Sequence, residues 1–135
     1  MTLSKNEKLV VAITSLWALA NTMSAVFVNV YLYAYTGSLV VMTIYCIIRI
    51  GLYPLFYTIA GKWAQRRNFS FPLTMGLVIT MLSLIFVLTM NDHFAAMPNL
   101  VYVVATLAGI GEAFFWLSVC SLHQIVATDE SRPRY

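Results

Sequence analysis

The chain alternates between long apolar runs and short polar segments. The first charged residues lie between Lys5 and Lys8, and a charge-free stretch of forty residues follows from Leu9 to Ile48. A membrane-spanning helix needs about 20 apolar residues, so this stretch is long enough for two crossings and a turn. The turn chemistry comes from residues 36–38, which are Thr-Gly-Ser. We therefore predict membrane-spanning helices over about 9–31 and 39–61.

Two further apolar runs occupy the second half of the chain. The run from Phe69 to Met90 has no charged side chain, and the run from Leu100 to Ile125 has a single one, Glu112. These lengths predict spans over about 69–90 and 99–125. The runs do not alternate strictly between apolar and polar residues, as strands of a membrane β-barrel must, so the spans are expected to be helical. The expected fold is all-α, with four transmembrane helices.

Composition argues against a soluble enzyme. The chain is 61% hydrophobic and 10% charged, whereas an average soluble domain is about 45–50% apolar and about 25% charged. Four spans use almost all of the 135 residues and leave no room for a water-soluble catalytic domain. We therefore expect residues 1–135 to form a single membrane domain that lies in a lipid bilayer and is not an enzyme.

The distribution of lysine and arginine predicts the orientation. A formal charge of +3 could suggest a nucleic-acid partner, but the basic residues are scattered between apolar runs and form no basic face, so none is expected. They lie in the N-terminal segment, the loop after the second run and the C-terminal tail: Lys5, Lys8, Lys62, Arg66, Arg67, Arg132 and Arg134. The other two loops have none. The positive-inside rule then places both termini and the middle loop in the cytoplasm of a multi-pass protein in the cell (plasma or inner) membrane.

Metal and cofactor sites have no support in the sequence. The two cysteines, Cys46 and Cys120, fall in separate apolar runs and form no Cys-x-x-Cys motif. His93 and His123 are expected near opposite membrane boundaries, so they could not share a metal ion. No cofactor, metal site or disulfide is predicted.

Arg49 and Glu112 are the two charged side chains deep within the apolar runs. At 1.5 Å per helical residue, both are expected near mid-membrane. A lone charge there costs about 2.5–3.5 kcal/mol, so we expect the two to be partners or to share a water-filled cavity. Two interpretations stay open: a buried pair that fixes helix packing, or a functional pair in which Glu112 takes up a proton or faces a cationic substrate.

A polar stripe runs along the first apolar run. Asn21, Ala25 and Asn29 recur at four-residue spacing, and the two amides project within about 80° of each other. Amides facing lipid are costly, so these should face another helix or a watery cavity. We predict that Asn21, Ala25 and Asn29 border a substrate cavity, with hydrogen bonding between helices as the alternative.

The loop after the second run resembles a known transporter signature. Residues 61–68 read Gly-Lys-Trp-Ala-Gln-Arg-Arg-Asn and are similar to a degenerate form of the G-x-L-A-D-R-x-G-R-R pattern of major facilitator superfamily transporters. Gly61, Ala64 and Arg66 match that pattern, whereas Gln65 lacks the carboxylate of its acidic position. The resemblance implies that the glycine lets the helix end lie close to a neighbour.

The resemblance to this family extends over most of the chain. The segment Gly109–Ala113 and the tail Thr128–Arg134 are similar to its fourth helix and to its connection between helices four and five. Ala105 stands where some members carry a fourth-helix arginine, so that role is not transferred. Because the family has two halves of six helices, the resemblance implies the first four helices of a longer, ion-coupled secondary transporter. Its partners would be a small-molecule substrate and the remaining helices.

Two other classes remain open. One is a self-contained four-helix transporter that works as a dimer, as in the small multidrug resistance family. That family has its working glutamate in the first helix, where the first apolar run of this chain has none. The other is a membrane assembly protein that transports nothing.

Overall fold

The computed structural model describes residues 4–66 and 68–126, and its regular elements are helices. The elements are α1 (Lys5–Thr36), α2 (Leu39–Gly51), α3 (Tyr53–Arg66), α4 (Ser70–Thr89), the short 3-10 helix η1 (Asn91–His93) and α5 (Leu100–Val126). With α2 and α3 counted as one span, the described part has four helices long and apolar enough to cross a membrane. This confirms the predicted all-α class and its four apolar spans.

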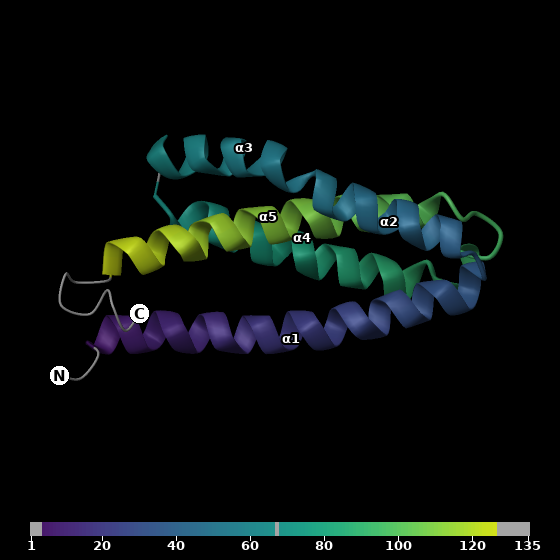
Figure 1. Ribbon diagram of the computed structural model, residues 1–135, viewed down its shortest axis with the longest axis horizontal. Coiled ribbons are helices and arrows are strands. Elements are labelled where there is room, and N and C mark those ends of the chain that lie inside the picture. The colour runs from purple at the N-terminus through teal and green to yellow at the C-terminus, as the bar shows by residue number, and fades with distance from the viewer. Residues whose placement is uncertain (1–3, 67, 127–135) are drawn as a thin grey trace.

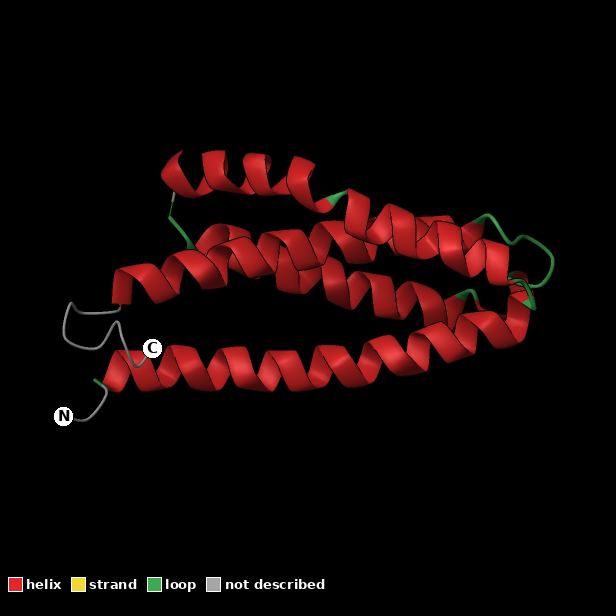
Figure 2. Cartoon of the chain, in the orientation of Figure 1, coloured by secondary structure: helices red, strands yellow, loops and turns green. Residues whose placement is uncertain are grey.

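Successive spans run in opposite directions along one bundle (Figures 1 and 2). The start of α1, the end of α3, the start of α4 and the end of α5 lie at one end, on the left in Figure 1. The turn after α1 and the η1 segment lie at the other. Among the described residues, Lys5, Lys8, Lys62 and Arg66 belong to the first end, and Asp92 to the second. The remaining basic residues named above outside the apolar runs, Arg67, Arg132 and Arg134, lie outside the described residues, as does the tail segment from residue 128.

Local capping extends α1 beyond the predicted 9–31. At its start, the Ser4 backbone N–H donates to Glu7 Oε2 at 2.6 Å, and the Glu7 N–H donates to Ser4 Oγ at 3.2 Å. This reciprocal capping box satisfies backbone donors that a helix start leaves free. At its end, Gly37 adopts φ 61° and its N–H donates to the Tyr33 carbonyl oxygen at 2.8 Å. A left-handed residue at that place favours glycine, because it lacks a Cβ.

The second span is broken at Leu52, where one continuous helix over 39–61 was expected. Pro54 explains the break, because it has no N–H to donate to the Ile50 carbonyl and its ring clashes with that group. The proline lies instead in the first turn of α3, where a backbone donor is not needed. Figure 1 shows α2 and α3 meeting end to end with a change of direction.

α5 is the centre of the bundle and contacts each of the other α-helices. Its interface with α4 depends on glycines. A Cβ on Gly76 would lie 2.7 Å from the Phe115 backbone nitrogen, and one on Gly111 would collide with Thr80. Small residues at such positions let two helix backbones approach closely within a membrane.

α1 is the least embedded of the spans. None of its most apolar window is buried inside the bundle, compared with 56% of the corresponding window of α5. Large side chains along α1, among them Leu16, Leu19, Phe27 and Val30, are exposed. α1 joins a hydrophobic cluster near the Gly37 turn through the buried side chain of Leu32, so it is anchored there and packs more loosely along the rest of its length.

Candidate functional site

Arg49 and Glu112 form an ion pair between α2 and α5. The Arg49 Nε–H donates to Glu112 Oε2 at 3.2 Å, and Arg49 Nη2 bonds to Glu112 Oε1. The side chains are 15% and 4% exposed, respectively. Two parallel bonds from one guanidinium to one carboxylate give the bidentate geometry of strong charge-assisted pairs. The two deep charges therefore neutralise each other.

Tyr53 is a third member of this cluster. Its hydroxyl donates to Glu112 Oε2, so Glu112 bonds to side chains on both sides of the Leu52 break. Arg49 comes from α2 and Tyr53 from α3, so one carboxylate of α5 connects the two segments of the broken span. Tyr53 was not among the site residues predicted from the sequence. The available signal was its position four residues after Arg49, which places both side chains on one face of a helix.

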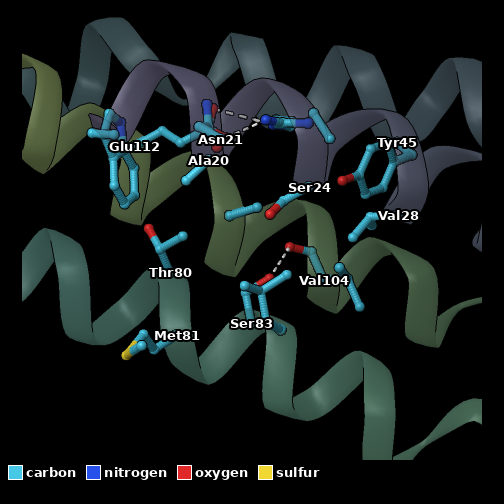
Figure 3. Close-up of a pocket in the computed structure, with 15 residues that line it drawn as sticks. Ala20, Asn21, Ser24, Val28, Tyr45, Thr80, Met81, Ser83, Val104 and Glu112 are labelled. Atoms are coloured by element: carbon cyan, nitrogen blue, oxygen red, sulfur yellow. Dashed lines mark hydrogen bonds and ion pairs between the residues drawn. The ribbon is translucent and has the colours of Figure 1, made fainter. Parts of the chain in front are cut away.

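A cavity of about 200 Å³ lies between α1, α2, α4 and α5 (Figure 3). Asn21 and Ala25 of α1 line it, and so do Arg49 of α2 and Glu112 of α5. The cavity therefore brings the predicted polar stripe and the predicted charge pair to one place. Sequence reasoning gave no sign of the contribution from α4, which includes Thr80.

Asn29, the third predicted cavity residue, does not line this cavity. Its Oδ1 is buried and has no hydrogen-bond partner among the described residues. Trp17, which does line the cavity, has a buried Nε1 that also has no hydrogen-bond partner among the described residues. The expected hydrogen bonding between helices is therefore not made by Asn29 Oδ1 within the described part of the chain.

The signature residues Gly61, Ala64 and Arg66 lie at the end of α3, away from the cavity lining. Ala64 is buried and Arg66 is exposed. A Cβ on Gly61 would meet Leu117 Cδ2 at 3.8 Å, which is ordinary van der Waals contact. Within the described residues, a Cβ at this position therefore fits without displacing the backbone.

Within residues 4–66 and 68–126, no group of three or more His, Cys, Asp or Glu side chains could hold a metal ion. Cys46 and Cys120 are free and exposed. The candidate site is therefore built on the contacts of Arg49, Glu112 and Tyr53.

Comparison with known proteins finds distant relatives. No family model and no solved structure matches the chain. It is 28% identical over 124 residues to "Uncharacterized protein in sodM 3'region" of Geobacillus stearothermophilus, a match that covers 92% of this chain and 56% of that protein. It is 29% identical over 115 residues to "Uncharacterized protein YqgE" of Bacillus subtilis, covering 85% of this chain and 26% of that protein. The chain thus spans about half the length of the first relative and about a quarter of the second, and its similarity is to longer bacterial proteins whose names state no activity.

Proposed function

We propose that the chain is part of the N-terminal half of an ion-coupled secondary transporter of the major facilitator type, which moves a small solute by alternating access. The observation that supports this most strongly is the cavity beside the Arg49–Glu112 pair. Glu112 lies near the middle of α5 (Leu100–Val126), so the cavity is at mid-span. Secondary transporters hold substrate near the bilayer midplane.

The cost of intramembrane charge also supports a solute-handling protein. Charged side chains within spans are rare, face the bundle interior, and mark substrate or ion pathways in many membrane proteins. Here Arg49 and Glu112 meet that description, since they face a cavity and one another. In the proposal the pair first of all holds α2 against α5, and any proton uptake by Glu112 requires that pair to open.

The lengths of the relatives support a larger bundle. The matched segment is only 26% of the second relative, so a protein of that kind has space for further spans. The proposed partners of this chain are therefore the remaining helices of a twelve-helix transporter. A four-helix dimer of the small multidrug resistance type is less well supported, because the mid-span glutamate, Glu112, lies in the fourth span, whereas Glu7 of the first span lies in its first turn.

The proposed orientation puts the start of α1 and the end of α3 in the cytoplasm. Lys5, Lys8, Lys62 and Arg66 lie at that end of the bundle, and the opposite end has no Lys or Arg among the described residues. Such a bias sets topology in short loops. The localisation that follows is the cell membrane.

Cysteine accessibility tests alternating access without knowledge of the substrate. The full-length protein carries Ala25→Cys in a background with Cys46→Ser and Cys120→Ser, in right-side-out and inside-out vesicles. A membrane-impermeant thiol reagent should label Ala25→Cys from both sides, because alternating access opens the cavity to each in turn. Leu82→Cys is the matched control, since Leu82 is 51% exposed on the outer surface of α4 and should face lipid. Labelling of Ala25→Cys from one side only, or from neither, contradicts the proposal.

A further inference from the structure

We propose that the cavity binds an uncharged molecule about the size of one substituted ring, whose hydrogen-bonding group is held by Asn21 and Ser24. This inference rests on the proposed function and names the substrate class of the same site. The inference depends on the positions of these two side chains. They lie one helical turn apart on α1 and both line the cavity (Figure 3).

The charge balance of the cavity favours an uncharged ligand. Arg49 and Glu112 are the only Lys, Arg, Asp or Glu side chains in the described lining, and they pair with one another. Both carboxylate oxygens of Glu112 are occupied, Oε1 by Arg49 and Oε2 by Arg49 and Tyr53. An ionic ligand would therefore enter a cavity with no free counter-charge, and burying an uncompensated charge is costly.

The hydroxyls of the lining are not equally available. Thr80 donates to the Gly76 carbonyl oxygen at 2.9 Å, and Ser83 donates to the Val104 carbonyl oxygen at 3.5 Å. The side chains of Asn21 and Ser24 make no hydrogen bond within the described part of the chain. A ligand hydroxyl or amide can bond to these two groups without displacing a bond that the helices already make.

The size of the cavity limits the ligand. An engineered apolar cavity of about 150 Å³ binds benzene, so a cavity of about 200 Å³ admits one ring with a short substituent. Apolar side chains that suit such a ring complete the wall, including Trp17, Val28, Met81 and Leu84. The ring of Trp17 is itself held in place, 4.0 Å from that of Phe115.

Three probes that share one ring test the charge preference: benzyl alcohol, benzylammonium and benzoate. Each is radiolabelled and its binding to the full-length protein in nanodiscs is measured, with empty nanodiscs subtracted to remove partition into lipid. Benzyl alcohol should bind saturably, and each ion should bind at least about tenfold more weakly, because its charge finds no partner. An ion that binds as tightly as the alcohol, or an absence of saturable binding by the alcohol, overturns the inference.

Two variants test the location. Ala25→Leu fills the cavity and should weaken benzyl alcohol binding about tenfold, whereas Ala12→Leu on the exposed surface of the same helix should leave it unchanged. If Ala25→Leu folds poorly, Asn21→Ala replaces it. Losing one hydrogen bond should weaken binding of benzyl alcohol about fivefold and leave binding of toluene unaffected. Alcohol binding that is insensitive to these cavity variants overturns the site.

The labelling experiment and the binding experiment test the transport cycle and the ligand class separately. Two-sided labelling of Ala25→Cys without binding of benzyl alcohol retains the transporter and rejects the substrate class. Binding of the alcohol with one-sided labelling, or with none, retains the site and rejects alternating access.

Discussion

Gly109 in α5 lies directly against the backbone of Arg49 in α2. A Cβ on Gly109 would be 2.6 Å from the Arg49 carbonyl oxygen and 3.2 Å from the Arg49 Cα, so only glycine permits this approach. Glu112 lies three residues further along α5, on the same side of the helix. The close packing of the two backbones and the ion pair between their side chains are therefore parts of one arrangement.

Gly109→Ala should weaken that arrangement. The added methyl group overlaps backbone, which cannot rotate away, so α2 and α5 must separate at a cost of about 1–3 kcal/mol. Thermal unfolding of the purified full-length protein measures the loss. Gly51→Ala is the matched control, because a Cβ there meets nothing within 4 Å. The control should be neutral or slightly stabilising, and equal loss in both variants would mean that close packing at Gly109 is unimportant.

Removing one partner of the charge pair should be worse than removing both. Glu112→Gln and Arg49→Gln each leave a buried uncompensated group, which typically costs about 3–5 kcal/mol. The double variant leaves two neutral amides and should recover folded yield. It should also recover two-sided labelling of Ala25→Cys, since we expect the pair to act mainly in packing.

Recovery of yield without recovery of two-sided labelling would assign Arg49 or Glu112 to the transport cycle. Single variants with normal yield and normal labelling would show that the two residues are not coupled. The charge-swapped double variant, Arg49→Glu with Glu112→Arg, is a further check, because it keeps one positive and one negative side chain in the pair.

Tyr53→Phe should reduce stability by about 1–3 kcal/mol, because the variant removes a hydrogen bond to a charged acceptor, Glu112. Tyr57→Phe is the control. Its ring stacks on Tyr53 at 5.9 Å, and its hydroxyl makes no hydrogen bond within the described residues. Chemical denaturation in detergent compares the two variants, and an equal effect would exclude a special role for the Tyr53 hydroxyl.

Topology reporters test the orientation. Fusions after Lys8, Arg67 and Arg134 should report the cytoplasm, and a fusion after Asp92 should report the outside, because Lys and Arg accumulate on the cytoplasmic side. Paired alkaline phosphatase and green fluorescent protein fusions give opposite signals at each position. An external signal after Arg67 would overturn the four-span map.

The four spans could be predicted because they depend on local composition. Leu9–Ile48, for example, holds enough apolar residues for two crossings, whatever surrounds it. The similar depth of Arg49 and Glu112 followed from counting residues along helices. The break at Leu52 could have been predicted from Pro54. The hydrogen bond from Tyr53 to Glu112 could not, because it depends on where α5 lies.

The cavity could be predicted only in part. Asn21 and Ala25 line it as expected, but Asn29 does not, although all three share one helix face. A periodic pattern identifies which side chains share one face of a helix. It does not identify which other helix packs against each turn of that face. The α4 wall follows from the close approach of Gly76 and Gly111, which no pattern in the α4 run alone indicates.

The Arg49–Glu112 pair underlies the packing, the cavity and the proposed ligand class, so its direct observation in a bilayer is the decisive measurement. Solid-state NMR can recouple ¹⁵N of arginine guanidinium groups with ¹³C of glutamate carboxylates in the full-length protein in lipid. We predict strong dephasing of one carboxylate signal, assigned to Glu112 by its disappearance in Glu112→Gln and its release from dephasing in Arg49→Gln. A Glu112 carboxylate signal that is not dephased by any arginine nitrogen would contradict the ion pair between Arg49 and Glu112.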